Sequence, residues 1–223
     1  MNYDQHFETS AQLRNDYWNS IGKLHEDVVT HVINPAFSGG PMWPSVRQAF
    51  VRIDTTSGTI LASDGLSDPY SDFDENETNR DYNGIGCEFY IECNEILGDF
   101  NHMKTSWQFS VLYQVAQLAA GNPNIASIIG EYTHVSTELY DCNVPDSYLN
   151  EHGRAGVLLG LASSRVAPNV QLSIENIALV NVRLLTLQEL HYINEHGETG
   201  RAKIAELLAQ YEGITDLSRP SVI

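Results

Sequence analysis

The spacing of apolar residues predicts a helix at the start of the chain. From Leu13 to Val32 they recur every three or four positions, which places them on one face of an amphipathic helix. Thr9 or Ser10 is expected to cap its start, because a side-chain oxygen there can accept a free backbone N–H. Pro35 is expected to end it, since the residue before a proline avoids the helical conformation.

Strands are predicted further along, where runs of apolar and β-branched residues are bounded by turn residues. The run at 85–93 alternates cleanly between apolar and polar positions, so we expect it to bury one of its faces. The segment 136–155 is polar and is predicted to be irregular. The predicted strands are 46–53, 58–63, 85–93, 156–162, 170–175 and 177–185, and helices are predicted at 102–120 and near 123–130.

The last part of the chain has the signals of two short helices. Thr186 and Glu189 match a capping box, in which each side chain accepts the other residue's backbone N–H, so a helix is expected to begin there. Gly197 is expected to end it, and Thr199 to cap a final helix that runs to about Tyr211.

Together these elements predict an α/β (α+β) fold with a mixed, largely antiparallel sheet flanked by helices. Helices and strands do not alternate regularly, which argues against a doubly wound parallel sheet. No linker or composition shift divides the chain, so residues 1–223 are expected to form a single domain. The sequence Asn-Glu-His-Gly occurs at 150–153 and again at 194–197, which is interpreted as chance or as two loop or helix-end signals.

The uneven distribution of charge is the feature of the composition that says most about possible partners. The chain carries 29 acidic and 12 basic residues, a net charge of −17, and residues 53–153 hold 17 of the acids but only two bases. Such a region repels phosphate backbones, so direct nucleic-acid binding is not expected. An acidic surface can steer a basic protein partner toward it, or it can serve solubility alone, and both interpretations remain open. Residues 64–82, the acidic loop, are long enough to be functional or mobile.

The three cysteines predict reduced, buried thiols. Their number is odd, and the first residues lack the basic and apolar regions of a signal peptide, so a cytoplasmic protein without disulfides is expected. Cys87 and Cys93 lie about 20 Å apart along one predicted strand and cannot pair. No run of about 18 apolar residues predicts a membrane-spanning helix.

Motifs for metal, cofactor or covalent chemistry are absent from the sequence. Zinc spacings, phosphate-binding glycine loops and the nucleophile elbow do not occur. An EF-hand that starts at Asp72 fails, because Glu77 and Asn83 replace its glycine and its bidentate glutamate. We therefore expect no cofactor, no metal site, no catalytic residues and no enzymatic activity, with an unrecognised active site as the alternative.

Two parts of the chain resemble a known family. Residues 65–72 read Gly-Leu-Ser-Asp-Pro-Tyr-Ser-Asp, and residues 84–91 read Gly-Ile-Gly-Cys-Glu-Phe-Tyr-Ile. Near the other end, Thr-Leu-Gln-Glu-Leu-His at 186–191 precedes Ala-Glu-Leu-Leu at 205–208. In order and spacing these segments, which extend over about residues 10–220, resemble the Suppressor of fused family.

The resemblance implies a mixed-sheet domain that is not an enzyme and that works by binding another protein. Animal members carry a second, C-terminal domain and bind Gli-type transcription factors, whose peptide lies as a strand between the two domains. This chain is expected to lack the second domain and to be similar to single-domain bacterial members. Those are thought to be immunity proteins of toxin–antitoxin type, which neutralise a toxin by direct binding. Because this chain is acidic and many nuclease toxins are basic, a basic toxin domain is the expected partner. A regulator or scaffold that binds another protein by strand addition is the alternative.

The resemblance also implies where a partner binds. Asp68, Tyr70 and Asp72 match family residues near the ligand-binding face, whereas Leu61 stands where the family has a tyrosine. An alternative is that Asp68 only shapes a turn by accepting backbone amides. With the neighbouring acids of the loop, the predicted partner-binding residues are Asp68, Tyr70, Asp72, Asp74, Glu75 and Glu77.

Overall fold

A computed structural model of the chain describes residues 1–30 and 35–223. Its helices are α1 (Tyr3–Ile21), α2 (Phe100–Thr105), α3 (Trp107–Ala120), α4 (Ile125–Tyr132) and α5 (Leu187–Leu208), with short 3-10 turns η1 (Pro35–Ser38), η2 (Glu77–Asp81), η3 (Asp146–Tyr148) and η4 (Ala209–Tyr211). Its strands are β1 (Lys23–Leu24), β2 (Val29–Thr30), β3 (Ala49–Thr55), β4 (Gly58–Asp64), β5 (Cys87–Cys93), β6 (Val135–Leu139), β7 (Ala155–Leu159), β8 (Asn169–Gln171), β9 (Asn176–Leu184) and β10 (Ile214–Thr215).

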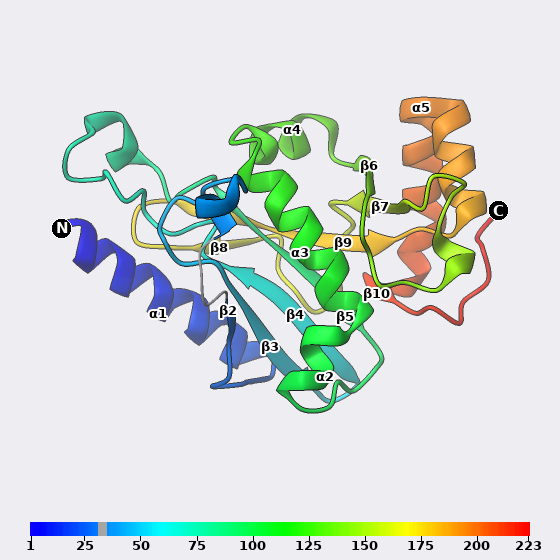
Figure 1. Cartoon of the computed structure of the whole chain (residues 1–223), viewed down its shortest axis with the longest axis horizontal. Helices are drawn as coiled ribbons and strands as arrows, with labels where there is room; N and C mark the ends of the chain where they lie inside the picture. Colours follow the sequence, from blue (N-terminus) through cyan, green and yellow to red (C-terminus); the bar gives the residue numbers. More distant parts are fainter. Residues whose placement is uncertain (31–34) are drawn as a thin grey trace.

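Among the described residues, the ten strands form one mixed sheet with helices packed against it (Figure 1). The main order is β1-β3-β4-β5-β9-β7-β6, with β2 beside β3, β8 beside β9 and β10 beside β5. Of the strand pairs among the described residues, only β5 with β9 and β5 with β10 are parallel. The predicted mixed, largely antiparallel sheet with flanking helices is confirmed.

The central strand β5 is buried on both faces, not on one as its alternation predicted. Cys87, Phe89, Ile91 and Cys93 point into the core formed with α3. On the opposite face Tyr90 packs against Trp18 of α1, with 6.2 Å between the ring centroids. The polar positions of the strand are therefore covered by α1 and its neighbours, and the glutamates among them need buried partners.

The first helix differs from its prediction at both ends. Asn2, not Thr9 or Ser10, caps α1, in a capping box with Gln5. The helix ends at Ile21, because the next residue, Gly22, runs against β3, where an added Cβ would lie 2.4 Å from the Asp54 carbonyl oxygen. The chain then pairs with β3 as β1 and β2. The predicted helix end at residues 31–34 lies outside the described residues.

One other helix prediction was wrong, and another was confirmed in part. The segment 102–120 is two helices, because Ser106 interrupts it and caps α3 by accepting the Phe109 N–H. At the other end, the capping box of Thr186 and Glu189 is confirmed. The two expected helices are present on either side of Gly197, whose φ of 58° breaks the helical geometry as predicted, and they form one element, α5, with a kink at this residue. Thr199 donates to the His196 carbonyl in this kink instead of capping a separate helix.

The segment predicted as irregular contains β6, which pairs antiparallel with β7. Its Glu138 connects the two Asn-Glu-His-Gly segments, because the Nδ2 groups of Asn150 and Asn194 both donate to its carboxylate, at 2.9 and 3.2 Å. The glycines of both segments, Gly153 and Gly197, take left-handed backbone angles. The repeated sequence thus corresponds to a turn at 150–153 and a helix kink at 194–197, and both contact one carboxylate.

None of the helices among the described residues combines the length and the apolar character that a membrane crossing requires.

Candidate functional site

The acidic loop leaves the sheet at Asp64, the last residue of β4, and the chain returns to the sheet at β5. Residues 64–68, here called the loop root, are all buried, whereas most of residues 70–82, here called the loop tip, are exposed. In Figure 1 the tip lies above the start of α1, at the same end of the molecule. Root and tip therefore have different environments within one short stretch of sequence.

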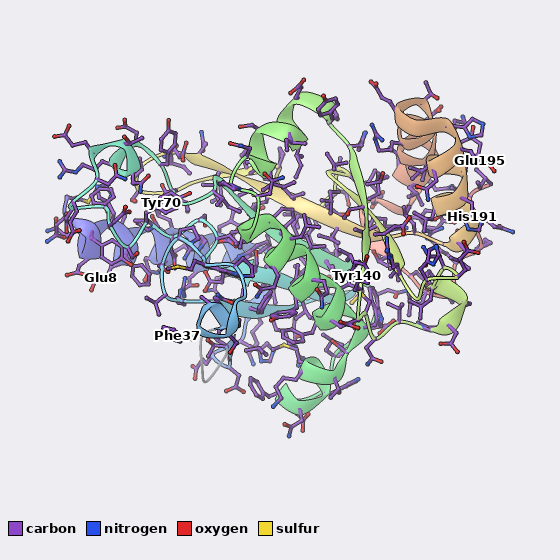
Figure 2. All side chains as sticks on the ribbon, turned by 45° about the horizontal axis from the view of Figure 1, so that its top comes forward. Glu8, Phe37, Tyr70, Tyr140, His191 and Glu195 are labelled. Carbon is purple, nitrogen blue, oxygen red and sulfur yellow. The ribbon has the colours of Figure 1, made fainter. Side chains whose placement is uncertain are left out.

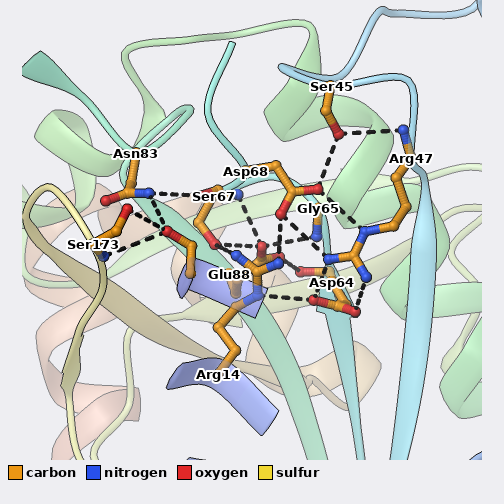
Figure 3. A network of polar contacts seen from close by, with 12 residues as sticks. Arg14, Ser45, Arg47, Asp64, Gly65, Ser67, Asp68, Asn83, Glu88 and Ser173 are labelled. Carbon is orange, nitrogen blue, oxygen red and sulfur yellow. Dashed lines mark hydrogen bonds and ion pairs between the residues drawn. The ribbon is translucent and has the colours of Figure 1, made fainter. Parts of the chain in front are cut away.

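Arg14 of α1 lies at the centre of the loop root (Figure 3). Its guanidinium donates to Asp64 at 2.8 Å, to the Ser67 hydroxyl at 3.1 Å and to Asp68, and only 1% of the side chain is exposed. Burial alone would lower the pKa of Arg14, but the charges of Asp64, Asp68 and Glu88 outweigh it and raise that pKa. Arg14 is thus a permanent cation inside the protein.

A second arginine closes the same network from the solvent side. Arg47 donates to Asp64 Oδ2 at 2.8 Å and to Asp68 Oδ2 at 3.2 Å, and its side chain is 31% exposed. Burial would raise the pKa of Asp68, but Arg14 and Arg47 outweigh it and hold the pKa below its usual value. The two aspartates are therefore each bound between two arginines.

Glu88 of β5 shapes the turn of the loop root. Its Oε1 accepts the backbone N–H groups of Gly65, at 3.0 Å, and Ser67, at 2.8 Å, and also the Ser67 hydroxyl at 2.7 Å. Burial and the nearby Asp64 raise the pKa of Glu88. Gly65 is needed at this turn, because its φ is +142° and an added Cβ would lie 2.5 Å from the Arg47 carbonyl oxygen.

Asn83 fixes the point where the chain leaves the tip. Its Nδ2 donates to the Ser10 hydroxyl of α1 at 2.9 Å, and its Oδ1 accepts the backbone N–H groups of Ile174 and Glu175 at 3.0 and 3.2 Å. The following residue, Gly84, has a φ of +56° and passes so close to Leu66 that a Cβ would lie 2.1 Å from its carbonyl oxygen. Both ends of the tip are therefore bound to the body of the protein.

The tip itself folds around one buried aromatic ring. Phe73 is 3% exposed and its centroid lies 4.9 Å from that of His6. The carboxylate of Asp72 accepts the side-chain amide of Asn79 at 2.8 Å, and Arg80 donates to the carbonyl oxygens of Phe73 and Asp74. These contacts leave a row of exposed acidic side chains, which are Asp72, Asp74, Glu75, Glu77 and Asp81.

The predicted partner-binding residues fall into two groups. Tyr70 is half-buried, and Asp72, Asp74, Glu75 and Glu77 are exposed on the tip. Asp68 is 0% exposed, so a partner cannot touch it in this conformation. Its carboxylate also does not accept backbone amides as the alternative prediction had it, because the side chains of Arg14, Arg47 and Ser45 occupy it.

A groove of about 670 Å³ lies beside the tip. Tyr70, Asn79 and Tyr82 form its wall on the side of the loop. Burial and the charge of Asp72 raise the pKa of Tyr70. The opposite walls come from α4 and from the β8–β9 hairpin, with Asn124, Ser127, Asn169 and Asn176 among the lining residues. Sequence reasoning missed these walls, because scattered asparagines on separate elements carry no pattern that marks a site.

The three cysteine thiols are not activated for covalent chemistry. All three thiols are free and buried, as predicted, and burial raises the pKa of Cys142 to about 12. Burial likewise raises the pKa of Cys87 and that of Cys93, so these thiols are poor nucleophiles. Within residues 1–30 and 35–223, no three histidine, cysteine or acidic side chains are placed to hold a metal ion.

Comparison with known proteins identifies the fold. No family profile matches the chain, and no curated protein matches it in sequence. The structure described as "the Sufu-Fu complex crystal structure" is similar with a TM-score of 0.56 and 11% identity, over 97% of this chain and 92% of that one. The crystal structure of Drosophila Suppressor of fused is similar with a TM-score of 0.45 and 12% identity, over 88% of this chain and 42% of that one. The chain therefore has the fold of a Suppressor of fused-like domain, as its sequence motifs predicted.

Proposed function

We propose that this chain is a non-enzymatic protein-binding domain and that its partner binds at the loop tip and the adjoining groove. The observation that carries the proposal is the placement of exposed carboxylates on a loop whose root is fixed by buried ion pairs, next to a groove of about 670 Å³. A preformed surface loses little conformational entropy when it binds. The similar solved structure is itself described as a complex of Sufu with Fu.

Electrostatics favour a basic partner. The tip exposes five carboxylates, whereas its one arginine, Arg80, donates to carbonyl oxygens of the loop. Glu175 adds a further carboxylate to the groove. Charges of one sign on a concave surface raise the local concentration of an oppositely charged partner and speed its association. The same field repels nucleic acid.

For the class of partner we propose a basic toxin domain, which this chain would neutralise by direct binding in the cytoplasm, as an immunity protein. The support is the charge of the tip together with the resemblance to single-domain Suppressor of fused members. The exposed tyrosine Tyr82, which is 49% exposed, offers a ring face for a lysine or arginine of that partner.

Charge reversal at the tip tests this proposal. The matched pair of changes is Asp74→Lys with Glu77→Lys, because both residues are exposed, whereas Asp72 is needed by Asn79 within the loop. The control is Glu195→Lys with Glu198→Lys on α5, which makes the same change of charge. Figure 2 shows Glu195 at the opposite end of the molecule from Tyr70.

The tagged variants are used to capture proteins from the native host. We expect wild type and the α5 variant to retain the same basic protein, and the tip variant to lose it at least tenfold, with a weaker dependence on salt. Co-expression with that protein should restore growth only for the variants that bind. Equal capture by all three proteins would overturn the proposed surface.

A second candidate is a regulator or scaffold that binds by strand addition. It is favoured by β6, which lies at the end of the strand order and pairs with β7 along one edge. An exposed edge is a template for another strand. Capture that survives the tip changes but is lost when Ser136→Pro removes a backbone donor from β6 would support this alternative.

A further inference from the structure

Arg183 is a buried arginine whose guanidinium has no hydrogen-bond partner among the described residues. Arg183 lies on β9 opposite Leu158 of β7, and its residue is 0% exposed. None of its three guanidinium nitrogens meets a hydrogen-bond acceptor in the described part of the chain. Arg14, which is equally buried, uses all of its nitrogens on side chains of the loop root. A buried charge without a partner is strongly unfavourable, so Arg183 points to a missing acceptor.

The groups around Arg183 leave one positive charge uncompensated. The ring of Tyr211 lies 5.3 Å from the guanidinium carbon of Arg183 and 5.6 Å from that of Arg219. The buried carboxylate whose charge acts on Arg183, that of Glu189, is already occupied: Arg219 binds both of its oxygens, and the N–H groups of Thr186 and Val222 donate to it at 2.9 and 3.1 Å. This buried cluster therefore holds two cations and one anion.

The remaining acid nearby, Asp216, forms no ion pair with Arg183 and is only partly buried, so solvent screens its charge and the buried cluster still lacks one anion. Its carboxylate is oriented away from this role by Ser218, whose backbone N–H and hydroxyl donate to it at 2.8 and 2.6 Å; these hydrogen bonds outweigh burial and lower the pKa of Asp216. Burial and the charge of Arg219 lower the pKa of Arg183 to about 10, so Arg183 still carries its charge at neutral pH. A water molecule would satisfy its N–H groups but not its charge.

We propose that Arg183 binds a small monovalent anion of the halide class, such as chloride, beneath the C-terminal segment of the chain. One negative charge balances the cluster, whereas a divalent anion would create an excess of the opposite sign in a buried site. The guanidinium carbon lies over the Tyr211 ring, and the three guanidinium nitrogens have no acceptor among the described residues, so their N–H groups are left for the anion.

The anion would hold the C-terminal segment in place. Residues 212–223 leave η4, add β10 to β5 and return to α5, where Arg219 binds Glu189 (Figure 1, red). Asn181, two residues before Arg183 on β9, donates to the Gly213 carbonyl at 3.1 Å and so brings this segment close to the proposed site. Anion binding should therefore slow amide hydrogen exchange in residues 212–223.

The first test compares thermal unfolding in sodium chloride and in sodium gluconate at equal ionic strength, which keeps general screening of the acidic protein constant. We expect chloride to raise the midpoint of wild type by about 3 °C once it is well above its dissociation constant. Arg183→Met should be insensitive to the choice of anion. It should also be at least as stable as wild type in gluconate, because an apolar side chain replaces an unpaired charge.

The matched control is Arg201→Met on α5, which makes the same change of charge and should keep the chloride response. A wild type that does not distinguish chloride from gluconate would overturn the proposal, and so would an equal chloride response in Arg183→Met.

The second test needs only wild type and so remains decisive if Arg183→Met does not fold. Crystals are grown in bromide, which binds as chloride does and can be located by its anomalous scattering. We expect a bromide ion in contact with the guanidinium of Arg183. Ordered water at Arg183 with bromide found only on the surface would overturn the proposal. The site lies far from the loop tip, so this result is independent of the proposed protein partner.

Discussion

The loop root and the loop tip are adjacent in sequence and both carry acidic side chains, but only those of the root form ion pairs with arginines. Asp64 and Asp68 are buried between Arg14 and Arg47. A few residues later, Asp74 and the other acids of the tip face solvent. Buried pairs of this kind fix a conformation, whereas exposed charges set up a field that a partner can sense. The root therefore determines the shape of this surface, and the tip determines its charge.

The largest effect is expected when the cation of the root is removed. Arg14→Met leaves Asp64, Asp68 and Glu88 buried without it, so the free energy of unfolding should fall by about 3–5 kcal/mol. Urea denaturation measures this. Arg201→Met is the control and should change stability by less than about 0.5 kcal/mol. Similar stabilities for the two variants would mean that the root is not held by its ion pairs.

The next effect is expected at the return of the chain from the tip. Gly84→Ala should lower the free energy of unfolding by about 2–3 kcal/mol. The left-handed backbone at this position is strained for alanine, and the new Cβ meets the Leu66 carbonyl oxygen. Gly153→Ala has a similar φ but open space around it, so its cost should be about 1 kcal/mol. The difference between the two variants measures the close approach. Equal costs would contradict a tightly packed root.

The pH dependence should also separate root from tip. Because Arg14 and Arg47 outweigh burial and lower the pKa of Asp68 in the folded protein, Asp68 contributes stability above its ordinary pKa of 3.8. That contribution is lost as the pH falls from about 3.8 through the lower folded pKa. Asp68→Asn should therefore show a shallower loss of stability below pH 3.8 than wild type, measured by denaturation at several pH values. An unchanged slope would show that Asp68 does not titrate as a paired group.

The smallest effect on stability is expected at the tip. Asp74→Lys with Glu77→Lys should change the free energy of unfolding by less than about 0.5 kcal/mol, since both side chains are exposed. Its association rate with a basic partner should nevertheless fall about tenfold or more at low salt. A strongly destabilised tip variant would mean that the tip is part of the folded core rather than a surface for recognition.

Local patterns made much of the fold predictable. The strands around the turn at 55–58, the strand at 85–93, the capping box at Thr186 and the buried thiols follow from spacing and turn chemistry. The predictions failed where distant segments decide. Gly22 ends α1 because β3 lies against it, and β5 is buried on a second face because α1 covers it. Neither contact is encoded in the neighbouring sequence.

The candidate site was also predictable only where local sequence decides it. Charge counts located the acidic loop but could not distinguish Asp68 inside from Asp74 outside. The excess of acids in residues 53–153 is partly neutralised in space by arginines from outside that segment: Arg14 and Arg47 at the root, and Arg165, which lies 3.1 Å from the buried Glu92. The groove walls on α4 and the β8–β9 hairpin come together only in the folded protein.

Site-specific photo-crosslinking in the native host tests the division between root and tip most directly. A photoreactive phenylalanine analogue is placed at Asp74 on the tip, at Ser136 on β6 or at Glu195 on α5. The account predicts that Asp74 captures a basic protein that the other two positions do not. Capture of the same protein from Ser136 or Glu195, with none from Asp74, would contradict it.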